Sequence, residues 1–315
     1  MKKIDIYLIA GQSNAAGCTK VRDAEAIYAA VPELRQGFDH VLYAGNARSD
    51  ASQYTVLENR DVPWSPARLG LGIRNDGYMG PEAGMAVSLS KIYNESTHRY
   101  AGLIKFAHGG TSLLEKRVSS NSFGNWVPPS YAKELNIPWQ GDPITGELYR
   151  LLLAQIERNV KELIAAGFDR IDVKGLYWMQ GCNNRTLPRE YRRAFRFFAD
   201  DIRRDVTALM EKLTGVPWGT AGMPIFVGTL SQTFSLNDEN TEKAVNIPFI
   251  EMQRSLGKEI ENCYTVDNSA YAITRWHTCP EDREILGTDP WHWNQTDALE
   301  IGKNVGKMML EKCVQ

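Results

Sequence analysis

The sequence has few cysteines, and they are not arranged as a metal knuckle or a disulfide framework. An odd number of thiols that are scattered along the chain argues against both a cystine-stapled scaffold and a structural zinc site. We therefore expect free thiols, no bound metal and a reducing, cytoplasmic compartment. The five cysteines in 315 residues are Cys18, Cys182, Cys263, Cys279 and Cys313, and no two of them are spaced C-x-x-C.

The sequence also lacks a long apolar run and an excess of charge of one sign. No run is long enough to cross a bilayer, and the first residues show no cleavage-site pattern of a secretory leader. Basic and acidic residues number 36 and 38, and the net charge is −2. Nucleic acids and anionic membranes attract proteins with basic stripes, and this chain has none. We expect neither kind of partner.

Apolar strand-like segments alternate with amphipathic helix-like segments along the whole chain. This alternation predicts an α/β fold with a mostly parallel sheet covered by helices on both faces. With no repeat or linker in view, we expect one domain over residues 1–315, with long functional loops near 45–80 and 111–146. The expected strands are 4–10, a weaker one at 41–45, 100–107, 171–179, 224–228 and 263–267, and the expected helices are 82–93, 147–166, 190–213 and 295–312.

Small polar residues and glycines follow three of the expected strands. Gly11-Gln12-Ser13-Asn14 follows the first strand, His108-Gly109-Gly110 follows a middle one, and Gln180-Gly181 follows the next. Ligands of parallel sheets bind beyond the carboxyl ends of the strands, so these three motifs predict a site there. Ser13, at the tip of its turn, is the candidate nucleophile.

A serine hydroxyl needs a neighbouring base and a third group that orients the base. His292 has Asp289 three residues before it, and His277 has Glu281 and Asp282 nearby. The first pair is the better candidate and the second remains an alternative. On the residues alone, His292 is equally well explained as a half-buried loop histidine between two tryptophans.

Donors for a developing oxyanion are also available near these strand ends. The Ser13 N–H, the backbone at Gly109 and Gly110, and the side-chain amide of Gln180 are the candidates. An ordinary turn explains the glycines, and a polar strand end explains the glutamine, just as simply. The α/β-hydrolase pattern G-x-S-x-G is excluded, because Ala15 stands at its last position. The phosphate-binding pattern G-x-x-x-x-G-K-[ST] and a dinucleotide fingerprint in the first turn are absent as well.

Four motifs in this order resemble the SGNH hydrolase superfamily, and more closely its sialate O-acetylesterase and acetyl xylan esterase branch. They are Gly11-Gln12-Ser13-Asn14, Gly109-Gly110-Thr111-Ser112, Trp178-Met179-Gln180-Gly181 and Asp289-x-x-His292. The resemblance implies a flavodoxin-like three-layer α/β/α sandwich and no metal or organic cofactor. It implies Ser13 as nucleophile, His292 as base, Asp289 as orienting acid, and Ser13, Gly109 or Gly110, and Gln180 as oxyanion donors.

One position departs from that branch. Its members often have Gln-Gly-Glu after the tryptophan motif, and this chain has Cys182 as the third residue. If the glutamate orients the base in those proteins, Asp289 must do so here. Cys182 itself is expected to be a buried, inert thiol, because no histidine or cation is adjacent in sequence.

Five further residues are candidates for substrate contact. Tryptophan faces stack on sugar rings but also fill protein cores, so each has two explanations. Gly80-Pro81-Glu82 resembles another motif of the same branch. The five candidates are Asn14, Glu82, Trp126, Trp291 and Trp293.

The expected function is hydrolysis of an O-acetyl ester on a carbohydrate through an acetyl-serine intermediate. Acetylated xylan, sialic acid and related glycans make the same chemical demands, so the sugar stays open. The alternatives are a short-chain acyl esterase or thioesterase of the same fold, an acetyl transferase, and a carbohydrate-binding protein without catalysis.

Overall fold

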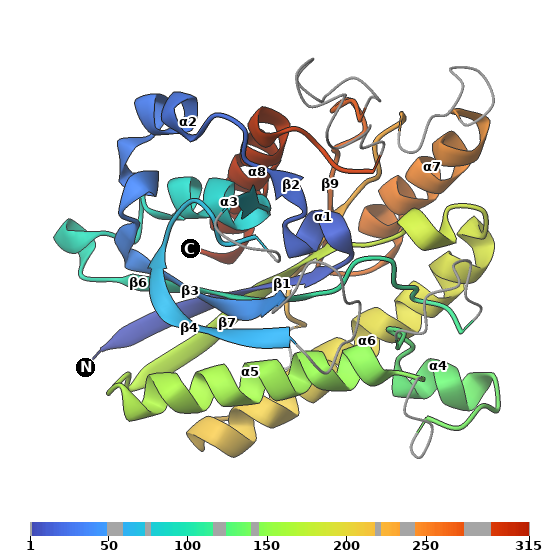
Figure 1. Cartoon of the computed structure of the whole chain (residues 1–315). Coiled ribbons are helices and arrows are strands. Elements are labelled where there is room, and N and C mark those ends of the chain that lie inside the picture. The colour runs from blue at the N-terminus through green and yellow to red at the C-terminus, as the bar shows by residue number, and fades with distance from the viewer. Residues whose placement is uncertain are drawn as a thin grey trace.

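A mostly parallel sheet lies between two layers of helices (Figure 1). The computed structural model describes residues 2–48, 59–72, 77–115, 124–139, 145–217, 222–233, 243–273 and 291–314. Within these ranges the seven strands of the sheet follow the order β4-β3-β6-β1-β7-β8-β9. The strands are β1 (Lys3–Gly11), β3 (Phe38–Arg48), β4 (Asn59–Ala67), β6 (Tyr100–Ala107), β7 (Arg170–Met179), β8 (Ile225–Gly228) and β9 (Cys263–Val266).

All strand pairings in this sheet are parallel except that of β4 with β3, which is antiparallel. The first strand of the chain is central, and every residue of β1 from Ile4 to Gly11 is buried. A parallel strand covered by helices on both faces reads as a continuous apolar run, as this one does. The expected α/β fold with a mostly parallel sheet is confirmed.

Two groups of helices cover the two faces of the sheet (Figure 1). On one face, α3 (Pro81–Leu89) packs against α8 (Gln295–Cys313), and the short α1 (Ser13–Ala16) lies against β1. On the other, α5 (Glu147–Ala165) packs against α6 (Pro188–Thr214), which also contacts α4 (Pro129–Glu134) and α7 (Lys243–Glu259). The smaller elements are β2 (Thr19–Lys20), α2 (Ala24–Ala30), η1 (Pro32–Arg35), β5 (Tyr78–Met79), η3 (Glu95–Thr97) and η4 (Cys182–Asn184).

The stretches expected to be long loops contain regular structure. The edge strand β4 lies within 45–80, and the helix α4 lies within 111–146. Pro63 and Pro66 are part of β4, and an edge strand tolerates proline because one of its sides needs no ladder donor. The helix α7 was not expected, and Pro248 stands inside it.

The helices α3 and α8 approach so closely that only glycine fits at their contact. A Cβ atom on Gly302 would lie 2.2 Å from the carbonyl oxygen of Pro81, and one on Gly84 would lie 2.1 Å from that of Leu299. Both obstacles are backbone atoms, which cannot rotate away. The contact fixes α8, and with it the segment around residue 292, against the N-terminal half of the chain.

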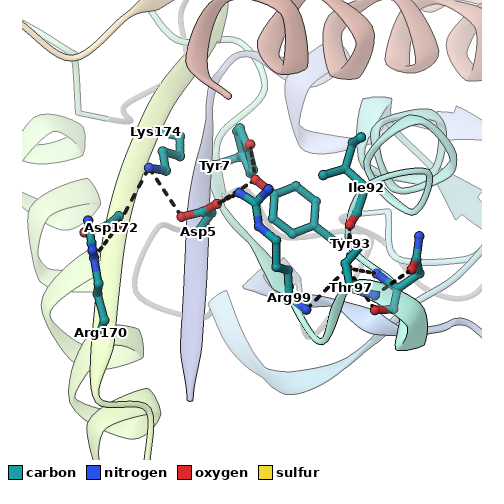
Figure 2. A network of polar contacts seen from close by, with 10 residues as sticks. Asp5, Tyr7, Ile92, Tyr93, Thr97, Arg99, Arg170, Asp172 and Lys174 are labelled. Atoms are coloured by element: carbon teal, nitrogen blue, oxygen red, sulfur yellow. Dashed lines mark hydrogen bonds and ion pairs between the residues drawn. The ribbon is translucent and has the colours of Figure 1, made fainter. Parts of the chain in front are cut away.

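A network of charged and phenolic side chains joins β1, β7 and the segment that precedes β6 (Figure 2). Asp5 Oδ2 accepts hydrogen bonds from the Tyr93 hydroxyl at 2.7 Å and from Arg99 at 3.0 Å. Lys174 Nζ lies 3.4 Å from Asp5 Oδ1, and the Tyr7 and Tyr93 hydroxyls are 2.7 Å apart. Burial raises the pKa of both tyrosines, so they stay neutral hydrogen-bonding groups. The network stabilises the end of the sheet that lies opposite the polar strand ends.

None of the helices in the described ranges is long and apolar enough to cross a bilayer. The four cysteines in these ranges, Cys18, Cys182, Cys263 and Cys313, are free thiols, as expected, and Cys279 lies outside them.

The glycine contact between α3 and α8 gives a stability prediction. Gly302→Ala places a methyl group against the Pro81 carbonyl, and we expect this overpacking to lower the free energy of unfolding by about 1–3 kcal/mol. Urea unfolding measures the change. Lys307→Ala, on the exposed side of α8, is the control and should change stability by less than about 0.5 kcal/mol. Equal stability of both variants would contradict the close contact.

Candidate active site

The register of three adjacent strands brings the three polar motifs together. Gly11, the last residue of β1, pairs with Ala107 of β6 on one side and with Met179 of β7 on the other. Gln12, His108 and Gln180 are therefore the next residues along three parallel neighbours, at one level beyond their carboxyl ends. The site expected at this edge of the sheet is formed by residues far apart in the chain.

A tight turn after β1 presents Ser13. Gly11 has a φ of +137°, and a Cβ atom there would lie 2.1 Å from the Met179 carbonyl oxygen, so no other residue fits. The Gln12 N–H donates to that same carbonyl at 2.9 Å. Ser13 then begins the four-residue helix α1 and is partly exposed, whereas the three residues that follow it are buried. The turn is held by backbone contacts and leaves the serine side chain at the surface of the site.

Gly109 lies next to Ser13. A Cβ atom on Gly109 would stand 3.4 Å from the Ser13 Cβ and 3.8 Å from the Ser13 Cα, and it would meet no other described residue within 4 Å. The absent side chain therefore leaves space directly beside the serine. As the first residue of a helix, Ser13 also carries a backbone N–H with no intrahelical acceptor. Ser13 thus has open space on one side and a backbone N–H group that is not bonded within its helix.

Gln180 connects the three motifs from within the protein. Its side chain is fully buried, and Nε2 lies 3.2 Å from Gln12 Oε1, 3.1 Å from the Thr111 carbonyl and 3.0 Å from Asn184 Oδ1. Three protein acceptors occupy the two N–H groups of this amide. The expectation that Gln180 donates to a substrate oxyanion is therefore not supported, because no N–H group is left for it.

Two residues that the sequence analysis did not single out as functional, Gln12 and Asn184, complete this network. Gln12 Oε1 accepts from the Gly181 N–H at 3.0 Å, and Asn184 Nδ2 donates to Ser112 Oγ at 2.8 Å. Gln12 stood inside a recognised motif, and Asn184 follows the third motif by three residues. The only sequence signal for either was its position beside a strand end.

The C-terminal segment is bonded to the Ser13 turn. Asn14 Nδ2 donates to the Trp291 carbonyl at 3.2 Å, so the residue after Ser13 binds the residue before His292. Gln295 Oε1 accepts from the backbone N–H of Arg22 at 2.7 Å, which ties the start of α8 to the same N-terminal region. The structure thus places the segment that carries His292 next to the turn that carries Ser13, and the His292 side chain is half-buried. Asp289 and the alternative base His277, with Glu281 and Asp282, lie outside the described residues.

Four of the five candidates for substrate contact are buried against other parts of the protein, and the structure corrects these expectations. Trp126 has no exposed surface and packs edge-on against Trp178, at a centroid distance of 5.1 Å. Trp293 is buried and donates to the Tyr271 carbonyl, and Glu82 is buried beside Lys105. A ring or carboxylate enclosed by protein has no face for a sugar. Asn14 is also buried and binds the Trp291 carbonyl, whereas Trp291 is 43% exposed.

The described residues contain no group of three or more histidine, cysteine, aspartate or glutamate side chains that could hold a metal ion. Cys182, at the position that departs from the family pattern, is buried. Burial raises the pKa of its thiol to about 12, so the thiol stays protonated at neutral pH. A protonated, enclosed sulfur is a poor nucleophile, which agrees with the expectation of an inert cysteine.

The environment of Cys182 predicts slow alkylation of the folded protein. Cys182 is buried, and only a small fraction of its thiol is ionised. Iodoacetamide at pH 8 should therefore leave Cys182 unmodified while the protein is native and modify it fully in urea. Peptide mass spectrometry reads the modification of each cysteine separately. Cys263, whose thiol pKa is also raised to about 12 by burial, is the internal control. Rapid alkylation of Cys182 in the native protein would contradict its placement.

The fold is similar to those of solved structures. The structure is similar to that of NanS, with a TM-score of 0.61, 13% identity and coverage of 98% of this chain and 97% of that one. It is also similar to a protein of Arabidopsis thaliana, with a TM-score of 0.54, 16% identity and coverage of 98% of each chain. At such identities the similarity shows a common fold. A comparison with curated proteins finds no match.

The sequence itself matches a family model. The model describes carbohydrate esterases that are sialic acid-specific acetylesterases, and it matches residues 3–311. The match spans the three motifs at the sheet edge and the segment with His292. The chain therefore belongs to this carbohydrate esterase family, and it is an enzyme that removes O-acetyl groups from carbohydrates.

Proposed function

We propose that the chain is a serine esterase in which Ser13 is the nucleophile, His292 the general base and Asp289 the acid that orients the base. The observation that carries the proposal is the hydrogen bond from Asn14 to the Trp291 carbonyl, which joins the neighbour of Ser13 to the neighbour of His292. Asn14 and Trp291 are 277 positions apart in the sequence. A bond between their neighbours supports a common site.

The chemistry follows from these groups. The Ser13 hydroxyl attacks the carbonyl carbon of the acetyl ester, and its proton passes to the His292 ring. The protonated ring then gives this proton to the sugar oxygen, which leaves as an alcohol, and an acetyl-serine remains. Water, deprotonated by the same ring, attacks the acetyl-serine, the ring returns that proton to the Ser13 oxygen as the acyl bond breaks, and acetic acid leaves and ionises to acetate. No step requires a metal ion.

Asp289 is proposed as the orienting acid because of its sequence position. The spacing Asp-x-x-His allows a turn to bring the carboxylate to the imidazole, where it fixes the tautomer and stabilises the charged ring. The other position at which an acid would be expected, that of Cys182, holds a protonated thiol that cannot perform this role.

The negative oxygen of the tetrahedral intermediate is proposed to bind backbone N–H groups at Ser13 and at Gly109 or Gly110. The space left beside Ser13 by the absent side chain of Gly109 supports this arrangement. Backbone donors held by the sheet and by the α1 turn need no reorganisation as the charge develops. Gln180 is proposed to stabilise this oxyanion site indirectly, since its amide donates to Gln12 Oε1 and to the Thr111 carbonyl.

The substrate is proposed to be an O-acetylated sialic acid, with acetylated xylan as the second candidate. The description of the family names sialic acid. The exposed face of Trp291 stands one residue before the proposed base, where it can stack on the sugar ring whose acetyl group is cleaved. An aromatic face of this kind suits either sugar, so the choice requires a measurement.

Acetate release tests the nucleophile and the substrate together. Wild-type enzyme should release acetate from 4-nitrophenyl acetate and from O-acetylated sialic acid, and Ser13→Ala should lower both rates by about 10³-fold or more. Ser255→Ala, a serine on α7 whose hydroxyl donates to the Met252 carbonyl, is the matched control and should keep the full rate. His292→Ala and Asp289→Asn should also lose most of the activity.

Other outcomes of this experiment are equally informative. Full activity in Ser13→Ala would refute the proposed nucleophile. Faster turnover of acetylated xylan than of the sialic acid would move the substrate to xylan, and a preference for long acyl chains would favour a general esterase. Sugar binding without turnover of any acetyl ester would indicate a binding protein.

Gly109 gives a second test that separates access from folding. In Gly109→Ala the added methyl group would stand 3.4 Å from the Ser13 Cβ and 3.8 Å from the Ser13 Cα, and among the described residues it would meet Ser13 alone. We expect a stability change below about 1 kcal/mol. The kcat/KM should fall at least about tenfold, because the methyl group fills the space through which the ester reaches Ser13. Thermal unfolding and initial rates measure the two effects, and an unchanged rate would place the ester elsewhere.

A further inference from the structure

A fully buried ion pair lies beneath the helix that begins with Ser13. Lys105 of β6 and Glu82 of α3 have at most 1% of their surface exposed, and Lys105 Nζ lies 3.1 Å from Glu82 Oε2. Glu82 Oε1 accepts from the Gly80 N–H at 2.7 Å. The pair is therefore enclosed by protein, and neither group can contact a substrate.

The ammonium group of Lys105 joins three separate segments. In addition to its ion pair with Glu82, it donates to the Ala16 carbonyl at 3.0 Å and to the Leu71 carbonyl at 2.8 Å. Ala16 is the last residue of α1, and the final carbonyls of a helix have no partner within it. Lys105 thus satisfies a carbonyl at the end of the helix whose first residue is Ser13.

The helix α1 has little stability of its own. It has four residues, and a helix of one turn has too few hydrogen bonds to persist without tertiary contacts. Its amino end follows β1 directly, so the strand fixes that end. The carboxyl end is held by Lys105 and by the contact of Gly17 with Gly72 and Gly80, where added Cβ atoms would clash. The direction of α1, and so of Ser13, depends on these contacts.

Glu82 connects the same pair to the other half of the site. It lies in the first turn of α3, which packs on α8 at Gly84 and Gly302. The helix α8 starts three residues after His292. The ion pair therefore contacts α1 through the Ala16 carbonyl. Through Glu82 it is also part of α3, the helix on which α8 packs.

An apolar pair would fill this space at less cost than two charges. Removing both charges from water is expensive, and the attraction between them repays the loss only when the geometry is good. Burial accordingly lowers the pKa of Lys105, and the nearby Glu82 opposes that change. A hydrophobic pair, however, could not donate hydrogen bonds to the carbonyls of Ala16 and Leu71.

We propose that Lys105 and Glu82 are positioning residues, which hold α1 so that Ser13 faces the base and the ester. This inference rests on the proposed function of Ser13. The pair acts through α1 and α3, and its loss should slow the chemical step more than it weakens substrate binding.

Three variants separate positioning from simple stability. Glu82→Gln keeps the shape and removes the negative charge. The double variant Glu82→Leu/Lys105→Met replaces the pair by apolar side chains. Tyr149→Phe, which removes a buried hydroxyl that donates to Asp205 at 2.6 Å on the opposite face of the sheet, is the control. Each is assayed for thermal unfolding, for kcat and KM on 4-nitrophenyl acetate, and for hydrogen exchange.

We expect Glu82→Gln and the double variant to lower kcat at least about tenfold while KM changes less than about threefold, because Ser13 is misplaced. The double variant should recover a melting temperature at or above that of Glu82→Gln without recovering kcat. The amides of residues 15–18, which bond to the Gln12 and Ser13 carbonyls, should exchange faster. Tyr149→Phe should melt earlier and keep kcat within about twofold.

Two results would overturn the inference: a double variant with the kcat of the wild type, or unchanged exchange at residues 15–18 in both variants. Hydrogen exchange does not require activity, so it also decides the matter when a variant is too slow to assay. Failure of the proposed function has a different signature, since acetate release would then persist in Ser13→Ala whatever the ion pair does.

Discussion

The register of β1 with β6 and β7 is the constraint on which the rest of the site depends. Parallel pairing places Gly11 opposite both Ala107 and Met179, so three chain segments leave the sheet at one level. Ladder hydrogen bonds fix this arrangement, because a slip of one residue would turn every side chain of a strand to the opposite face of the sheet, against the other layer of helices. The backbone of the sheet therefore sets the relative heights of the Ser13 turn, Gly109 and Gln180 before any side chain contributes.

Much of the fold could be predicted because the central strands are apolar runs that helices cover on both faces. β6 was expected at 100–107 and is found at Tyr100–Ala107. β4 and α7 could not be predicted, since both contain proline, which local rules exclude from a central strand or a helix interior. In each case tertiary packing outweighs the local preference: β4 is an edge strand on β3, and α7 packs on β9 and α6.

The site was predictable only where sequence position determines spatial position. Ser13 and Gly109 follow adjacent parallel strands, so their proximity follows from the topology. The partners of long polar side chains do not follow from the topology, because they depend on which element packs above the sheet. Glu82 meets Lys105, and the Gln180 amide meets Gln12 and Asn184. A signal existed for Lys105, a charged residue inside the apolar run Leu103-Ile104-Lys105-Phe106-Ala107, and a lysine there requires a buried partner.

Two kinds of interaction form the site. Backbone pairing and glycine contacts set the distances between segments, and at Gly11 and Gly302 no side chain can be added at all. Buried polar groups then fix orientation, because a hydrogen bond has a direction that an apolar contact lacks. The nucleophile that we propose, Ser13, requires both, since it must lie close to its base and face it. The polar residues packed around the Ser13 turn are therefore better explained by the precision that the reaction demands than by the stability of the fold, which the apolar core supplies.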